Sequence, residues 1–146
     1  MKKIGITVGA FDLCHYGHIL VFKEAKQVCD YLVVGLHTHP HLAPVSYRGK
    51  KKSKPIMSIK ERYAILKAIK YIDKVFLYKT EKELLQKLKE IDWDVRIIGV
   101  DWKGKKLTGW NLKKGEIYYN SRNHNHSTTE LKRRIVNASN KELDKI

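Results

Sequence analysis

The sequence predicts an α/β domain in which five strands form a doubly wound, mostly parallel sheet. Strand-like runs alternate with helix-like runs along the chain, which is the order that such sheets require. Residues 31–36 are apolar almost throughout, as expected of a parallel strand buried on both faces. The chain has 146 residues, of which 42% are hydrophobic, and this suffices for one core. We therefore expect a single domain over 1–146, with its core in 1–136 and a short C-terminal tail in 137–146.

The first βαβ unit is expected within residues 4–36. Apolar residues alternate over 4–8, which indicates a strand, and an amphipathic run over 19–29 indicates a helix before the second strand, with His15 and His18 on its opening turn. The connecting residues 9–18 then lie at the carboxyl end of the first strand, where open α/β sheets bind their ligands.

Capping boxes predict where the remaining helices begin, because Ser58, Thr80 and Ser127 each stand three residues before a glutamate. Strands are expected between and after the first two of these helices, over 74–78, 95–100 and 116–120.

Each of these helices shows an apolar face. In the helix after Ser58 the face consists of Ile59, Ala64, Ile65, Ala68 and Ile69, and Arg62 and Lys70 fall outside it. In the helix after Thr80 the face consists of Leu84, Leu85, Leu88 and Ile91. The apolar side of the last helix consists of Leu131, Ile135 and Val136.

Residues 9–18 read Gly-Ala-Phe-Asp-Leu-Cys-His-Tyr-Gly-His. A strand that ends at Gly9 and continues into a helix offers the unpaired N–H groups of the first helical turn to an anion. His15 and His18 stand three residues apart, so their imidazole N–H groups can reach the same phosphate. Histidines near a helix start are also common as ordinary polar surface, but the long ordered pattern favours a phosphate-binding loop.

This pattern resembles the signature of the nucleotidyltransferase superfamily that also includes class I aminoacyl-tRNA synthetases, above all that of the small cytidylyltransferases such as the glycerol-3-phosphate cytidylyltransferases. A second stretch agrees: Ser127, Thr128 and Thr129 follow Arg122 much as in the family's Arg-Thr-x-Gly-Ile-Ser-Thr-Thr. Hydroxyl and free N–H groups at a helix start bind phosphate oxygens, and Arg122 adds a guanidinium, although Ser127 also suits a plain helix cap. The resemblance covers residues 1–136 and implies a Rossmann-like nucleotidyltransferase (HUP-like) fold.

The resemblance implies transfer of CMP from CTP to a phosphorylated alcohol or polyol, with glycerol 3-phosphate as the leading acceptor and pyrophosphate as the product released. The catalytic residues that it implies are His15, His18, Lys51 and Arg122. The nucleotide-binding residues are Gly9, Ala10, Phe11, Lys70, Asp101, Trp102, Ser127, Thr128 and Thr129. The acceptor-binding residues are Asp12, Lys54 and Arg62. Mg²⁺ is expected to arrive with the triphosphate, and no metal-ligating residue is predicted.

Lys51 and Lys54 belong to a basic tract over 47–55. Its functional interpretation is a mobile lid whose ammonium groups close over a triphosphate, and its plainer interpretation is a solvated lysine loop. Arg62 follows a glutamate as in the family, whereas Lys70 stands where arginine is usual and would lose the bidentate fork.

Three features leave the substrates open. Val100 replaces the first acid of the family's Gly-Asp-Asp-Trp, which leaves the base preference open, and His39 stands where an acid is usual, which leaves the acceptor open. His37, His39 and His41 alternate and are compatible with a metal site, but without cysteine or carboxylate partners a polar loop is favoured.

The formal charge of +15 predicts attraction for polyanions without choosing among them. Two alternatives to CMP transfer therefore stay open: an adenylyltransferase that uses ATP on a phosphorylated small molecule, and a basic nucleic-acid-binding module that keeps the fold without chemistry. We expect small-molecule substrates and no specific nucleic acid.

The setting of the protein is predicted to be the cytoplasm. No run approaches the ~20 apolar residues of a membrane span, and the N-terminus does not resemble a signal peptide. Cys14 and Cys29 suit reduced thiols better than a disulfide. The resemblance also implies a homodimer.

Overall fold

The computed structural model describes residues 2–44 and 51–145. Its elements, in chain order, are β1 (Ile4–Gly9), α1 (Tyr16–Val28), β2 (Tyr31–His37), η1 (Pro40–Leu42), α2 (Ile59–Ala68), β3 (Lys74–Tyr78), α3 (Glu81–Glu90), β4 (Val95–Gly99), η2 (Val100–Trp102), β5 (Glu116–Asn120) and α4 (Thr128–Asp144).

The predicted fold class is confirmed. The five strands form one sheet in the order β3-β2-β1-β4-β5, and every neighbouring pair is parallel. The strand order reverses between β1 and β4, because β1 pairs with β2 on one side and with β4 on the other. A doubly wound sheet binds ligands at this reversal, on the carboxyl edge of the strands.

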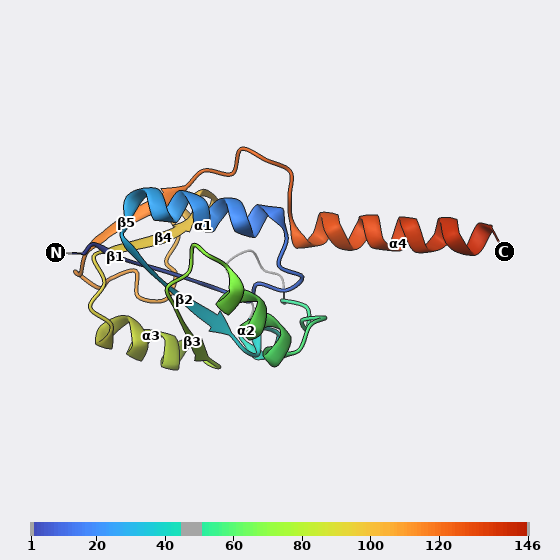
Figure 1. Ribbon diagram of the computed structural model, residues 1–146. Coiled ribbons are helices and arrows are strands. Elements are labelled where there is room, and N and C mark those ends of the chain that lie inside the picture. The colour runs from blue at the N-terminus through green and yellow to red at the C-terminus, as the bar shows by residue number, and fades with distance from the viewer. Residues whose placement is uncertain (1, 45–50, 146) are drawn as a thin grey trace.

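Apolar side chains form a core on each face of the sheet. On one face, Phe22 and Ala25 of α1 and Leu66 of α2 pack against β2 and β4. On the other face, Leu84 and Leu88 of α3 pack against β1 and β3. Figure 1 shows α1 and α3 on opposite sides of the sheet. Because helices cover both faces of the sheet, a ligand is expected at the carboxyl edge of the strands.

One predicted feature of the helices is confirmed and one is wrong. α1 begins at Tyr16, so that the histidine pair stands at its opening turn, and the side chain of His15 caps the helix by accepting from the N–H of Gly17. Arg62 lies on the buried face of α2 with only 2% of its surface exposed, whereas Ala64 and Ala68 are exposed. The hydrophobic pattern placed Arg62 on the surface because it counts only apolar residues.

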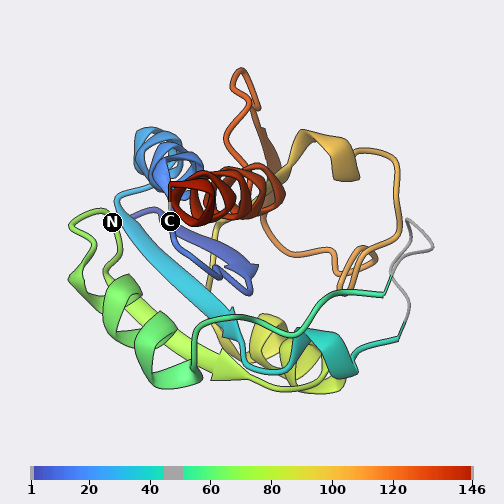
Figure 2. The same cartoon turned by 90° about the vertical axis from the view of Figure 1, so that its right-hand side faces the viewer.

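The apolar side of the last helix suggested that this helix packs against the rest of the domain, but it does not. α4 leaves the body at its first turn and projects away from it (Figure 1). Figure 2 looks along its axis, with the outer turns toward the viewer. Ile135 and Val136 are 48% and 56% exposed. The helix runs unbroken through the predicted boundary at residue 136, so the division into core and tail stays a prediction.

None of the helices in the described part of the chain combines the length and the apolar character needed to cross a membrane. Cys14 and Cys29 are both free thiols. Burial raises the pKa of both, which fits packing roles.

Candidate active site

The turn between β1 and α1 is held in a strained conformation. Phe11 and Leu13 have φ angles of 50° and 51°, a region that side chains other than glycine seldom adopt. The residue between them, Asp12, is buried, and its carboxylate accepts hydrogen bonds from the backbone N–H groups of Ile56 and Met57 at 2.8 and 2.9 Å. This carboxylate ties the turn to the chain that leads into α2.

The histidine pair stands at the start of α1, as predicted. The two rings are stacked, with centroids 3.9 Å apart. His15 Nδ1 accepts from the N–H of Gly17 at 3.0 Å, and His18 Nδ1 accepts from the N–H of His15 at 3.1 Å. The edge of the His18 ring also meets the buried Phe11 ring, at 5.4 Å between centroids. Both imidazoles are therefore fixed in orientation by the backbone and by packing.

These contacts determine the protonation state of the pair. Burial, together with the neighbouring His15, lowers the pKa of His18 to about 3, and burial also lowers the pKa of His15. Each Nδ1 accepts a hydrogen bond, so each neutral ring carries its proton on Nε2. The site thus presents N–H donors at neutral pH rather than imidazolium charges.

Gly17 is required by a close approach of two backbones. A Cβ at this position would lie 2.9 Å from the carbonyl oxygen of His126 and 2.8 Å from Cε1 of His15. The chain that leads into α4 therefore passes directly over the first turn of α1. The glycine between the two histidines allows the two helix starts to come together.

The start of α4 forms the second wall of the site. Ser127 caps the helix, because its Oγ accepts from the N–H of Glu130 at 3.0 Å. Thr128 Oγ1 lies 3.3 Å from His15 Nε2 and 3.5 Å from the carbonyl oxygen of Asp12. The N–H groups of Thr128 and Thr129 come before the first intrahelical bond, from Leu131 to Ser127, and so remain available to an anion.

Arg122 adds a cation beside this wall. Its Nη1 donates to Asp101 at 3.3 Å, and both side chains are partly exposed. The pair links the end of β5 to the loop after β4, on the side of the histidines where α4 begins.

These groups surround one cavity of about 680 Å³ at the carboxyl edge of the sheet. Most of the predicted site residues line it, namely Gly9, Phe11, His15, His18, Lys51, Asp101, Trp102, Arg122, Ser127, Thr128 and Thr129. Lys52 joins Lys51 in the wall, and residues 47–50 of the basic tract lie outside the described residues. The two signatures, more than a hundred residues apart, meet in this cavity.

Three predicted residues form a support beneath the site and do not line its cavity. The Arg62 guanidinium donates to the carbonyl oxygens of Met57, Ala10, His37 and Thr38 at 2.8–3.1 Å. Ala10 contributes its carbonyl to this network, and Asp12 is committed to two backbone N–H groups. The geometry favours a positioning role for Arg62 and Asp12 over direct contact with a substrate.

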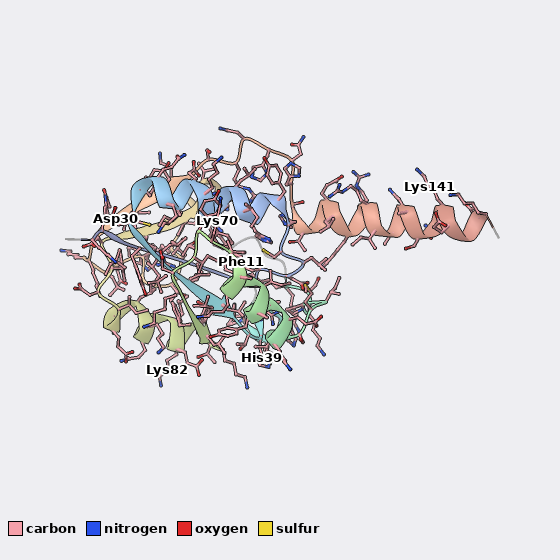
Figure 3. All side chains as sticks on the ribbon, viewed as in Figure 1. Phe11, Asp30, His39, Lys70, Lys82 and Lys141 are labelled. Carbon is pink, nitrogen blue, oxygen red and sulfur yellow. The ribbon has the colours of Figure 1, made fainter. Side chains whose placement is uncertain are left out.

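The two remaining predicted residues, Lys54 and Lys70, are exposed and lie outside the cavity wall. Lys70 follows the end of α2 and stacks over the Tyr71 ring. A helix that runs antiparallel to its strands ends at their amino edge, so Lys70 lies away from the histidines. In Figure 3, Lys82 and Lys141 also point outward from the molecule.

The alternating histidines do not act together. His37 is buried, stacks on the Tyr78 ring at 4.7 Å, and lies 3.1 Å through Nε2 from the carbonyl oxygen of Lys79. His39 and His41 follow in a short turn, with ring centroids 6.0 Å apart. Over residues 2–44 and 51–145, the structure shows no group of three or more metal-ligating side chains, and it thus offers no support for a metal site here.

The cavity also contains polar residues that the sequence reasoning missed, namely Tyr78, Glu81, Arg96, Thr108 and Asn120. One of them left a signal: Arg96 interrupts the apolar run 95–98 of a strand that was expected to be buried. The others occur in ordinary positions at element ends, and only the fold brings them together.

A doubly wound sheet with a stacked histidine pair at its reversal point, faced by a hydroxyl-rich helix start, is the arrangement expected of an α/β nucleotidyltransferase. A family model described as cytidylyltransferase-like matches residues 6–134. The chain belongs to this family, and the protein is a nucleotidyltransferase.

Comparison with known proteins gives further detail. The chain is 36% identical to the glycerol-3-phosphate cytidylyltransferase of Bacillus subtilis (strain 168), over 93% of this chain and 98% of that protein. It is 32% identical to the enzyme of the same name from Staphylococcus aureus, over 92% and 96% of the two chains. Among solved structures, a lipopolysaccharide core biosynthesis protein from Thermoplasma volcanium has the same fold, with a TM-score of 0.63, 22% identity, and coverage of 84% of this chain and 100% of that one.

Proposed function

We propose that the protein transfers CMP from CTP to a phosphorylated alcohol and releases pyrophosphate, with glycerol 3-phosphate as the leading acceptor. The observation that carries this proposal is the pair of oriented, neutral histidines facing the start of α4 across one cavity. The two glycerol-3-phosphate cytidylyltransferases similar to the chain support the choice of nucleotide and acceptor.

The reaction needs no covalent enzyme intermediate. An oxygen of the acceptor phosphate attacks the α-phosphorus of CTP in line, the bond from that phosphorus to the bridging oxygen breaks, and pyrophosphate leaves. The protein contributes by positioning the reactants and by stabilising the charge on the α-phosphate oxygens. The Nε2–H groups of His15 and His18 are the donors that supply this stabilisation.

The leaving pyrophosphate binds at the start of α4. The free N–H groups of Thr128 and Thr129 and the guanidinium of Arg122 all face the cavity there. Lys51 approaches from the opposite loop and neutralises charge on the flanking phosphates. Ser127 holds the helix start in place through its cap.

Magnesium is part of this proposal only as the companion of CTP. The described part of the chain offers no cluster of metal ligands, and the carboxylate of Asp101 in the cavity wall is paired with Arg122. The residues therefore do not fit a resident ion, and Mg²⁺ is expected to be carried in by the triphosphate oxygens.

Pyrophosphate release tests the proposal. CTP and ATP are each offered with glycerol 3-phosphate, ribitol 5-phosphate, ethanolamine phosphate and glucose 1-phosphate in the presence of Mg²⁺. We expect release with CTP and a polyol phosphate. Release with ATP alone would replace the proposal by adenylyl transfer, and no release with any pair would contradict it.

We also propose that the protein is a homodimer, as the family resemblance implies, and that it is located in the cytoplasm, as the sequence predicts. Sedimentation velocity should give about twice the chain mass of 17.1 kDa, and cell fractionation should recover the protein with cytoplasmic markers. A monomer at micromolar concentration, or recovery with membranes, would contradict the respective part.

A further inference from the structure

The cavity extends beyond the histidines into a region on the α3 side of the sheet. Four polar residues line it there: Tyr78 from the end of β3, Glu81 from the first turn of α3, Arg96 from β4 and Thr108 from the loop after η2. We call them the Arg96 cluster. Arg96 and Tyr78 are each only 4% exposed, so this is an interior surface.

Arg96 has more hydrogen-bond donors than its contacts within the protein use. Its Nη1 donates to the carbonyl oxygen of Thr108, and this is the one hydrogen bond of its guanidinium among the described residues. Thr108 in turn donates through Oγ1 to Glu81 Oε2 at 2.5 Å. Burying a guanidinium is costly unless its N–H groups find partners. Four N–H donors of Arg96 are left for a molecule in the cavity.

The charge of the cluster indicates what kind of molecule that is. The carboxylate of Glu81 balances the guanidinium of Arg96, and the Tyr78 hydroxyl stays neutral because burial raises its pKa. A second anionic group on the ligand would be repelled by the carboxylate of Glu81, and an ammonium group would be repelled by the guanidinium of Arg96. Hydroxyl groups, each both donor and acceptor, match a surface of mixed donors and acceptors with no net charge.

The position of the cluster fits the acceptor rather than the nucleotide. In the proposed reaction the pyrophosphate leaves toward α4 and Arg122, so an in-line attack must come from the opposite side of the histidines. Tyr78 and Glu81 lie on that side, because Tyr78 pairs with His37 at the ends of β3 and β2, across β1 from the strand that leads to Arg122. The guanidinium of Arg96 interacts electrostatically with both Tyr78 and Glu81. The body of an attacking acceptor would extend toward the cluster.

We propose that the Arg96 cluster binds the hydroxyl groups of the acceptor and thereby selects polyol phosphates over amino-alcohol phosphates. This inference rests on the proposed function and deepens it, since it assigns acceptor recognition to residues outside both sequence signatures.

A comparison of acceptors in the wild type and in Arg96→Met tests the proposal. The acceptors are glycerol 3-phosphate, its two deoxy analogues (the phosphates of 1,2-propanediol and 1,3-propanediol) and ethanolamine phosphate. A hydrogen bond to a charged group contributes enough to change kcat/KM about ten- to a hundredfold. We expect the wild type to prefer glycerol 3-phosphate over at least one deoxy analogue by about this factor, and Arg96→Met to lose the preference.

Glu81→Gln is the second variant, because it keeps the volume of the side chain and its acceptor for Thr108. It should lower kcat/KM for glycerol 3-phosphate while the KM for CTP stays within about threefold of the wild type. If Arg96 and Glu81 only held the loop of Thr108 in place, the variants would affect both substrates equally and the preference among acceptors would persist. That result would overturn the proposal.

Direct binding separates this inference from the proposed function. Calorimetry measures the affinity of glycerol 3-phosphate and ribitol 5-phosphate for the wild type and Arg96→Met, both loaded with a CTP analogue that has a methylene bridge between the α- and β-phosphates. Weaker binding to Arg96→Met supports the cluster even if no pyrophosphate is ever released, in which case the proposed function alone fails. Equal binding to both proteins, or no binding of either polyol phosphate to the wild type, refutes the inference even if catalysis is observed.

Discussion

Replacing His18 with asparagine should separate its catalytic donor from its structural acceptor. In the wild type, His18 Nδ1 accepts the N–H of His15 at 3.1 Å, and Nε2–H is the group left for the substrate. Asparagine carries an oxygen near the position of Nδ1 and nothing at the position of Nε2, so the helix start keeps its bond while the donor is lost. Loss of one donor to developing charge costs about 2.7–4 kcal/mol, so we expect kcat to fall ~10²–10³-fold.

Steady-state pyrophosphate release and CTP binding by calorimetry measure the two effects separately. The Kd for CTP should change by less than about threefold, because the donor contributes mainly in the transition state. His18→Gln is the matched control, since its amide nitrogen extends to the region of Nε2, and it should recover part of kcat. An equal loss of kcat and CTP affinity in His18→Asn would refute the transition-state role.

Three further predictions follow from buried contacts. Arg62→Met should lower the free energy of unfolding by about 3 kcal/mol in urea titrations, because four carbonyl oxygens lose their donor; a raised KM at unchanged stability would instead indicate direct substrate contact. Gly17→Ala should lower kcat/KM ~10²-fold, because its Cβ would push against the His126 carbonyl and displace the histidine pair; unchanged kinetics would contradict this close approach. The pKa of His18 is lowered to about 3 in the folded protein, so stability is fully present above the unfolded value of 6.5 and is lost as pH falls below it. Between pH 7 and pH 5, urea titrations should show a loss about 2 kcal/mol smaller in His18→Asn than in the wild type, and equal losses would contradict the shift.

The sequence was sufficient for features that depend on local patterns. Alternation and apolar runs located all five strands, and the capping boxes at Ser58 and Thr80 are formed in full. The proximity of His15 to Thr128 could also be expected, because both segments resembled phosphate-binding helix starts and parallel strands end at one edge of the sheet. The roles of the individual site residues stay predictions until they are tested.

The features that could not be predicted depend on partners far away in the chain. Arg62 is buried because it meets carbonyl oxygens from three separate loops, which no helical pattern can reveal. The sequence predicted that the apolar side of α4 packs in the core, but this side is exposed. An apolar stripe shows that a helix has an apolar face, but it does not show which other element covers that face. The capping role of His15 was not predicted because histidine is an unusual helix cap.

The two halves of the cavity differ in how closely they follow the family pattern. The half beside α4 contains both signatures, and its proposed role is common to all nucleotidyl transfers, namely stabilising charge around the α-phosphate and holding pyrophosphate. The half on the α3 side contains Arg96 and Thr108, together with Tyr78 and Glu81. A change there alters the fit of one acceptor without disturbing the reacting phosphates. The mechanism can therefore be inferred from the signatures, whereas the identity of the acceptor depends on the Arg96 cluster and has to be read from the folded protein.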